Sequence, residues 1–276
     1  DTVINLNDST VQSNTNLAGV SLSSNAFGGL TIAKGVSIQN VITGTADDTV
    51  VGNELDNDIT ITNGGNDTID GGADHDIVDY AGSATGIIVD MNIVDAQGYS
   101  TVGIGLESDL VRNVEEFIGS GSSDQISGGA EDNIIYGSGG NDRISGGTGA
   151  DVIDGGVGDD ILYMSVDTDN DTFIGGSGVD TLDASATSDS LFIDLVNGTL
   201  TGQGVDEIYG IEVVIASSAA DTIYGSSAVN TFDGGAGDDI LRGAGGADVI
   251  YGGAGNDIAD FSDQTGIVIV DLSDDG

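Results

Sequence analysis

The sequence predicts an all-β chain wound as a right-handed parallel β-roll, a solenoid of short strands joined by tight turns. Nine-residue segments recur in register, for example GGTGADVID (Gly146–Asp154), GGVGDDILY (Gly155–Tyr163) and GGAGNDIAD (Gly252–Asp260). In each segment the first six residues suit a Gly-rich turn and the last three a short strand. The chain has 47 Gly, 5% aromatic residues and no Pro or Trp, which favours repeated turns over a common two-layer core.

The sixth position of these segments is acidic or an amide, and it organises the turns into three stacks. The spacing is nine residues except from Asn57 to Asp67 and from Asp160 to Asp171, where the slips indicate a bulge or loop. The stacks consist of Asp48, Asn57, Asp67 and Asp76; of Asp124, Asn133, Asp142, Asp151, Asp160, Asp171 and Asp180; and of Asp221, Asn230, Asp239, Asp248 and Asp257.

The eighth position carries a large aliphatic residue in most segments. Side chains alternate between the two faces of a strand, so this residue is expected to point inward while its neighbours face solvent. Two layers of such strands would enclose a long, thin aliphatic core. The residues expected in it are Val50, Ile69, Ile126, Ile153, Leu162, Leu182, Ile223, Leu241 and Ile250.

A longer repeat encloses the short one and predicts three super-repeat units, 1–90, 91–194 and 195–276, with roll stacks at 44–80, 119–183 and 216–260. The units end at equivalent points, marked by Asn5, Asp90, Asp194 and Asp271. We therefore expect a processed or excised piece of a longer tandem array. The stretches 8–36, 93–110 and 197–207 are rich in polar residues and Gly, and are expected to be irregular loops or extra strands that cover the roll ends.

The charge is one-sided and restricts the possible partners. Acidic residues number 47 against four Lys and Arg, giving a net charge of −43, and 40 of the acids are Asp. Such self-repulsion opposes compaction unless cations neutralise it. Nucleic acids and anionic membrane surfaces are disfavoured as partners. No apolar run approaches the length of a membrane span, so no membrane insertion is expected.

These repeats closely resemble the RTX (repeats-in-toxin) family of secreted calcium-binding proteins, whose signature is GGxGxDxUx, where U is a large apolar residue. The resemblance covers roughly 44–80, 119–183 and 216–260. It implies Ca²⁺ between turns n and n+2, held by two sixth-position carboxylates and by Gly carbonyls of both turns. The pairs most strongly expected are Asp142 with Asp160, Asp151 with Asn133, Asp239 with Asp257, and Asp248 with Asn230.

The metal site residues that the resemblance implies are all sixteen sixth-position residues together with glycines of the turns. Three stacks of this length offer about ten n/n+2 pairs and hence up to about ten Ca²⁺. The glycines are Gly137, Gly139, Gly140, Gly146, Gly147, Gly149, Gly155, Gly156, Gly158, Gly234, Gly235, Gly237, Gly243, Gly246, Gly252, Gly253 and Gly255.

Departures from the consensus predict weaker sites. Asn57, Asn133 and Asn230 supply a neutral oxygen, and the first turn of each stack lacks its Gly pair. Residues 166–171 contain no Gly at all. We expect these sites to be weaker or absent, and the ends of each stack to load last.

Folding should be coupled to calcium, because repulsion and the entropy of Gly-rich turns oppose folding around so thin a core. The resemblance implies a type I secretion substrate, hence a secreted or cell-surface location and a Gram-negative source. We expect a structural or adhesive segment of a large surface protein, of the adhesin, S-layer or filament type. Its partners would be calcium, neighbouring repeats or copies of itself end to end, and a cell-surface or polysaccharide target.

Two alternatives use the same repeats. The chain could be the folding and secretion module of an enzyme such as a serralysin-like protease, a lipase or a mannuronan C5-epimerase. Catalysis by the segment itself is disfavoured, because it has no HExxH or GxSxG motif. The single histidine, His75, sits at a variable turn position and is expected to face solvent. Tyr99, Tyr136, Tyr163, Tyr209 and Tyr251 suit sheet packing better than sugar stacking.

Overall fold

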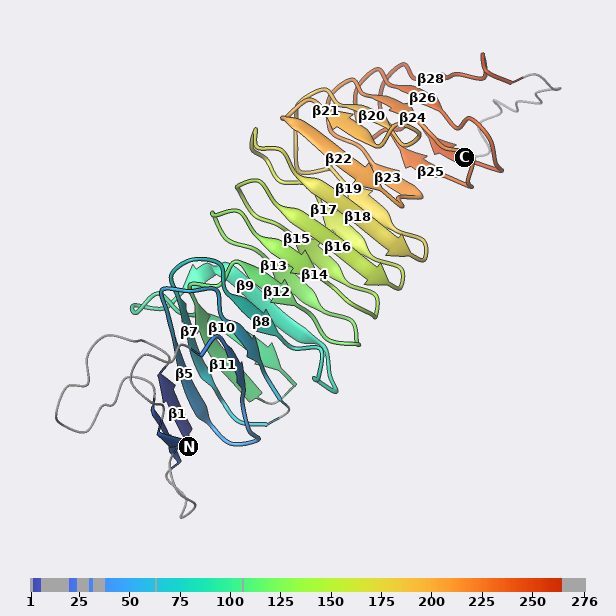
Figure 1. Cartoon of the computed structure of the whole chain (residues 1–276). Coiled ribbons are helices and arrows are strands. Elements are labelled where there is room, and N and C mark those ends of the chain that lie inside the picture. Colours follow the sequence, from blue (N-terminus) through green and yellow to red (C-terminus); the bar gives the residue numbers. More distant parts are fainter. Residues whose placement is uncertain are drawn as a thin grey trace.

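The computed structural model describes residues 2–5, 20–23, 30–31, 38–62, 64–105 and 107–264, the first three segments as backbone strands. These residues form 28 strands and no helix. The strands lie in two sheets that together make an elongated roll, with β1 near one end of it and β28 near the other (Figure 1). In this part of the chain no helix is long and apolar enough to cross a membrane.

Sheet I has 15 strands and sheet II has 13. Sheet I contains β1 (Thr2–Asn5), β2 (Val20–Ser23), β3 (Leu30–Thr31), β5 (Asp48–Asn53), β7 (Thr68–Gly72), β9 (Ile87–Val94), β10 (Ser100–Ile104), β11 (Glu107–Arg112), β13 (Gln125–Ser127), β15 (Arg143–Ser145), β17 (Ile161–Tyr163), β19 (Thr181–Asp183), β23 (Val213–Ile215), β25 (Thr231–Asp233) and β27 (Val249–Tyr251). Sheet II contains β4 (Asn40–Ile42), β6 (Asp58–Thr60), β8 (Ile77–Asp79), β12 (Glu116–Ile118), β14 (Ile134–Tyr136), β16 (Val152–Val157), β18 (Thr172–Ser177), β20 (Phe192–Asp194), β21 (Thr199–Thr201), β22 (Val205–Tyr209), β24 (Thr222–Tyr224), β26 (Ile240–Arg242) and β28 (Ile258–Ala259).

Within a stack, successive strands alternate between the sheets, so two nonapeptides complete one coil. Parallel neighbours in a sheet are therefore usually 18 residues apart. Ile135 of β14 pairs with Ile153 of β16, and Ile126 of β13 pairs with Ile144 of β15. This is the parallel β-roll that the nine-residue period predicts.

The core lies between the two sheets and consists mostly of aliphatic side chains, together with the fully buried rings of Tyr80, Phe117, Phe173 and Phe232. Most three-residue strands bury only their central residue, because the flanking residues point away from the roll. Of the nine residues expected at position eight, eight are at most 1% exposed, and Ile250 near the last coils is partly buried. Each fully buried aliphatic side chain stabilises the fold by roughly 1.5–3 kcal/mol, which is little for each coil.

The segments between stacks correct one expectation. They do not cover the ends of the roll but continue its sheets. In sheet I, β9, β10 and β11 form an antiparallel meander whose outer strands pair in parallel with β13 and β7. In sheet II, β20, β21 and β22 form a second antiparallel meander. Its outer strands, β20 and β22, pair in parallel with β24 and β18 respectively. Alternate residues of these inserts, such as Val102 and Leu200, are fully buried, so each insert contributes to the same core. Both sheets therefore run unbroken past both inserts.

The first insert lies in sheet I and the second in sheet II. The number of strands between the two inserts determines the sheet in which the second one lies. Eight alternating strands, β12 to β19, separate β11 from β20, so β20 and the rest of its insert fall in the sheet opposite to β11. Each insert adds two strands to one sheet only, which is about 10 Å of extra length on that side.

Strand β1 pairs in parallel with β5 in the same way that β9 pairs with β13 and β20 with β24. Asn5, Asp90 and Asp194 therefore occupy equivalent positions in the sheets, while the division into three units remains a prediction. Most of 8–36 and all of 265–276 lie outside the described residues.

Candidate calcium sites

The sixth-position side chains form two ladders along the edges of the roll. In each ladder, Oδ1 of a carboxylate accepts a hydrogen bond from the backbone N–H of the sixth-position residue two turns earlier. The donor and acceptor pairs in the second and third stacks include Asp124 and Asp142 (2.8 Å), Asn133 and Asp151 (2.8 Å), Asp142 and Asp160 (2.8 Å), Asp221 and Asp239 (2.8 Å), Asn230 and Asp248 (2.9 Å), and Asp239 and Asp257 (3.2 Å). The four pairs expected from the sequence are thus brought together.

The second carboxylate oxygen, Oδ2, is buried without a hydrogen-bond partner at most interior positions. This is true of Asp67, Asp76, Asp142, Asp151, Asp160, Asp180 and Asp239, whose exposure is at most 1%. An unpaired buried charge is strongly unfavourable, so such an oxygen requires a cation or a proton.

The glycine at position one leaves room for these oxygens. A Cβ on Gly137 would lie 2.4 Å from Oδ2 of Asp142 and 2.6 Å from the carbonyl oxygen of Gly155, two turns on. A Cβ on Gly234 would lie 2.5 Å from both Oδ2 of Asp239 and the carbonyl oxygen of Gly252. Carboxylate and carbonyl oxygens thus gather at one corner of each turn, and such hard oxygen donors suit Ca²⁺.

The glycines expected in the sites fall into three groups. Those at position one would place a Cβ within 2.5 Å of Oδ2 of their own Asp: Gly137, Gly146, Gly155, Gly234, Gly243 and Gly252. Those at positions two and four would place it under 3 Å from the backbone two turns earlier: Gly140, Gly147, Gly149, Gly156, Gly158, Gly235, Gly237, Gly246, Gly253 and Gly255. Gly139 differs, since its nearest neighbouring atom would be 3.8 Å away.

Burial perturbs the titration of the ladder. Desolvation is the largest cause, and it raises the pKa of Asp67, Asp76, Asp142 and Asp171 to about 7. It also raises the pKa of Asp151 and Asp180 to about 6. Neighbouring carboxylates add to the shift, for example Asp124 and Asp160 around Asp142. Without a cation, the ladder therefore favours protonated carboxyls near neutral pH.

The first turn of each stack is built differently. There Oδ2 is already occupied by a backbone N–H, donated by Gly44 to Asp48 (2.7 Å), by Ser120 to Asp124 (2.7 Å) and by Ser217 to Asp221 (2.9 Å). The hydroxyls of Ser120 and Ser217 donate to the same carboxylates. These oxygens are less available to a metal at the first turn, and the expectation that the ends of each stack load last stays a prediction.

The three amides keep the geometry of the turn but not the charge. Oδ1 of Asn57, Asn133 and Asn230 accepts an N–H from its own turn, from Asn53 (3.0 Å), Gly129 (2.7 Å) and Ser226 (2.8 Å) respectively. Each can offer a cation only a neutral oxygen, as the sequence indicates.

Four acidic residues that the repeat pattern did not single out extend the ladders past the stacks. Asp109 accepts the N–H of Asp67 (2.7 Å), and Glu115 that of Asp76 (2.9 Å). Asp206 accepts the N–H of Asp171 (3.1 Å), and Glu212 that of Asp180 (3.0 Å). The two Glu residues lie nine residues before Asp124 and Asp221, so the nine-residue spacing could have found them if Glu had been allowed. Asp109 and Asp206 come from the inserts and have no such signal.

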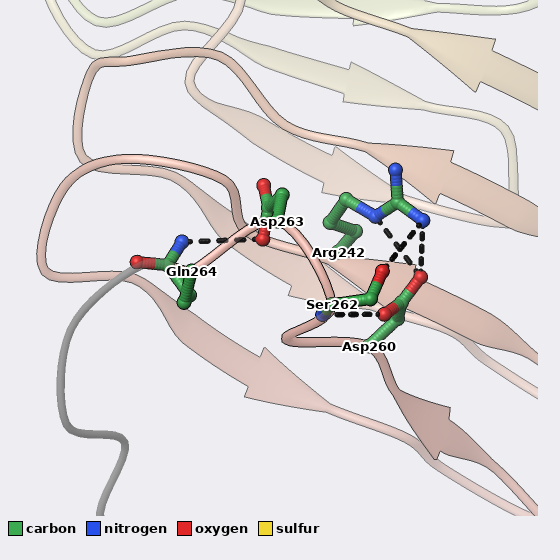
Figure 2. A network of polar contacts seen from close by, with 5 residues as sticks. All are labelled: Arg242, Asp260, Ser262, Asp263 and Gln264. Carbon is green, nitrogen blue, oxygen red and sulfur yellow. Dashed lines mark hydrogen bonds and ion pairs between the residues drawn. The ribbon is translucent and has the colours of Figure 1, made fainter.

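Two arginines each neutralise one carboxylate outside the ladders. The guanidinium of Arg242 binds Asp260 across one coil, and Asp260 also accepts the N–H of Ser262 (2.8 Å), as Figure 2 shows. Arg112 binds Asp70 (2.6 Å) and stacks on Tyr99. These contacts link the last coils to each other and the first insert to β7. Among the described residues, no Lys or Arg forms an ion pair with a ladder carboxylate.

The remaining candidates play no part in the ladders. His75 is half exposed in its turn, with Nε2 3.7 Å from a carboxylate oxygen of Glu116. Tyr136, Tyr209 and Tyr251 lie on the strand surfaces and are 36–59% exposed. Among the described residues, no group of three or more acidic, His or Cys side chains forms a ready metal cage. A cation bound at such a turn would therefore take at most two carboxylates. Backbone carbonyl oxygens beside the glycine at position one would complete its set of ligands.

A turn of this kind, repeated along two parallel sheets with one carboxylate per turn, defines a calcium-binding β-roll. The family model of the RTX calcium-binding nonapeptide repeat (4 copies) matches residues 53–83, 118–153, 136–163, 164–200, 208–241 and 224–259. These ranges cover more than half of the chain, which therefore belongs to the RTX calcium-binding repeat family. A search of curated proteins found no match. The repeats bind calcium, and the roll they form is a structural rather than a catalytic domain.

Proposed function

We propose that this chain is a calcium-folded structural or adhesive segment of a large secreted bacterial surface protein. The observation that carries the proposal is the unbroken course of both sheets past the inserts, from β4 to β28 and from β1 to β27. Three stacks joined in this way act as one rod, since no flexible linker separates them in the described residues. A rod of this kind suits a spacer or a display surface.

Calcium binding drives the folding of the chain into this rod. Among the described residues, seven sixth-position aspartates are buried with an unpaired Oδ2, within a chain of net charge −43. Binding free energy becomes folding free energy when a site does not exist in the unfolded chain. The chain is therefore unfolded where calcium is scarce and folds where it is at the 10⁻⁴–10⁻³ M typical of extracellular calcium modules.

This coupling supports a secreted location. An unfolded, acidic chain without disulfides passes through a secretion channel and folds outside, where calcium is abundant. RTX repeat proteins are typically secreted by the type I pathway of Gram-negative bacteria, and we extend that route to this chain. Ten cations would still leave a net charge of −23, so the loaded rod stays strongly acidic. Any target surface would then be neutral, basic or bridged by further calcium.

The test combines circular dichroism with small-angle X-ray scattering on the same sample. In millimolar Ca²⁺ we expect a β-rich spectrum and an elongated particle, because 15 strands in one sheet span roughly 70 Å. Excess EGTA should give an expanded, unordered chain, and millimolar Mg²⁺ alone should not restore the rod. A β-rich spectrum that survives EGTA would contradict calcium-coupled folding. A compact, isotropic particle in Ca²⁺ would contradict the rod.

A further inference from the structure

The loop between β17 and β18, residues 164–171, departs most from the repeat. Its sixth-position residue, Asp171, follows Asp160 by eleven residues, and the loop has no glycine. Asp171 nevertheless keeps its place in the ladder. It accepts the N–H of Asp151 (2.9 Å) and donates its own N–H to Oδ1 of Asp206 (3.1 Å). Asp206 belongs to the insert in sheet II, so the loop and the insert meet at this point.

Two carboxylates at this meeting point have an oxygen that nothing satisfies. Asp206 is 1% exposed, and its Oδ2 is buried without a partner. Oδ2 of Asp167 is also buried without a partner, while its Oδ1 accepts the N–H of Asp169 (3.0 Å). Burial is the largest cause that raises the pKa of Asp206 to about 6, and the neighbouring charge of Asp167 contributes to this shift. The two groups therefore lie within electrostatic range of each other.

The backbone holds the loop against the insert. The N–H of Val205 donates to Oδ1 of Asn170 (3.0 Å), next to Asp206. A Cβ on Gly204 would lie 2.5 Å from the carbonyl oxygen of Asp169, so this contact is close. The three ion pairs among the described residues involve Glu116, Asp70 and Asp260. None of them neutralises Asp167 or Asp206.

The first insert shows how the same position is satisfied without a cation. Asp109 is the equivalent of Asp206, since it accepts the N–H of the last residue of its ladder. Its Oδ2, however, accepts a hydrogen bond from the buried hydroxyl of Tyr80 (3.0 Å). At the second insert no hydroxyl takes this role, and a second carboxylate is present instead. Two buried carboxylates with free oxygens repel each other unless a cation lies between them.

We propose that Asp167 and Asp206 together bind a divalent cation of the calcium type, at a site that lies outside the nonapeptide pattern and ties loop 164–171 to the insert β20–β22. The proposal rests on the calcium-coupled folding described above. Two carboxylates from a loop and an insert offer the hard oxygen ligands that Ca²⁺ accepts in flexible geometry. The site replaces the expectation that a loop without glycine binds weakly or not at all. Its cation would link the second stack to the third.

The test counts bound ions by native mass spectrometry of the full chain loaded with Ca²⁺ alone. Asp206→Asn and Asp167→Asn keep a side-chain oxygen as acceptor for the N–H of Asp171 and of Asp169, but remove the charge. We expect each variant to bind one ion fewer than the unmodified chain, and the double variant also to bind one fewer rather than two. Glu207→Gln is the matched control, because Glu207 lies on the same strand and its carboxylate binds the exposed hydroxyl of Tyr209. It should leave the count unchanged.

The outcomes separate this site from calcium binding in general. If Asp167→Asn binds as many ions as the unmodified chain, the proposal is overturned, even where Asp206→Asn fails to fold. A double variant that loses two ions would also overturn it, since the two residues would then serve different sites. A chain that binds no Ca²⁺ at all would instead overturn the proposed function.

Discussion

The backbone N–H of Asp142 donates to Oδ1 of Asp160 over 2.8 Å, while Oδ2 of Asp160 is buried without a partner. One carboxylate thus has two tasks. Its first oxygen spaces the coils, and its second is free for a cation. The same division recurs at Asp151, whose Oδ1 accepts the N–H of Asn133 (2.8 Å).

Replacing Asp160 by Asn should separate these two tasks. The amide oxygen can still accept the N–H of Asp142, so the roll should form, but the charge for the cation is lost. We expect fewer bound Ca²⁺ in the second stack and an unchanged third stack, measured by calcium titration calorimetry with native mass spectrometry. Asp159→Asn is the control, because Asp159 is exposed and its Oδ1 accepts the N–H of Val179. An equal loss in both variants would contradict a specific role for the sixth position.

Without calcium, the folded state should become less stable as the pH rises, which is opposite to the pH dependence of most acidic proteins. The folded pKa of Asp67, Asp76 and Asp142 is raised to about 7 from 3.8. A raised carboxyl pKa stabilises the fold below 3.8, and this contribution is lost as the pH rises through about 7. In EGTA, therefore, lowering the pH from 8 to 5 should increase the β-structure seen by circular dichroism. A metal-free chain that is more ordered at pH 8 than at pH 5 would be inconsistent with these shifts.

Protons and calcium should compete for the same oxygens. Each carboxyl that must lose a proton reduces the apparent calcium affinity by up to about tenfold per pH unit below its pKa. We expect the calcium midpoint of folding to rise steeply between pH 7 and pH 5. A midpoint independent of pH over this range would show that the raised pKa values do not belong to the calcium ligands.

The glycines of the turns should tolerate substitution very unequally. Gly158 has φ +141°, and a Cβ there would lie 1.5 Å from the carbonyl oxygen of Gly140 in the coil before. Gly158→Ala should therefore force adjacent coils apart and lower the unfolding temperature in Ca²⁺ markedly. Gly98 also has a positive φ (+84°), but no atom lies within 4 Å of its Cβ position. Gly98→Ala should cost only the backbone strain, about 1–2 kcal/mol. Equal melting temperatures for the two variants would show that coil spacing is not set by glycine.

The thin core makes each aliphatic residue important. Ile153 is fully buried, whereas Ile42 is 71% exposed on β4. Ile153→Ala should lower the free energy of unfolding in Ca²⁺ by about 2–5 kcal/mol through lost burial and a cavity. Ile42→Ala should change it by at most about 0.5 kcal/mol. Denaturant unfolding in saturating Ca²⁺ measures both, and a small effect at Ile153 would mean that calcium alone holds the coils together.

The sequence predicts much of this architecture because the repeat is local. A turn and its strand lie within nine residues, so the period alone places Ile153 in the core, and the resemblance to the family adds the pairing of Asp142 with Asp160. The same period could not place Asp109 or Asp206 in the ladders, because both come from inserts whose path depends on pairing with strands far away in sequence. Nor could it show that the hydroxyl of Tyr80 satisfies Asp109 while Oδ2 of Asp206 has no partner.

By itself, the amino-acid sequence determined the fold class, because a period of nine specifies a turn and a short strand, and the calcium binding, because the repeated turns match the signature of the family. Only the tertiary structure decided how the stacks join. The inserts carry apolar residues such as Val102 and Leu200 that need a core, and open strand edges that need hydrogen bonds. Both needs are met only within the sheets of the roll, which is why the inserts extend the rod instead of capping it.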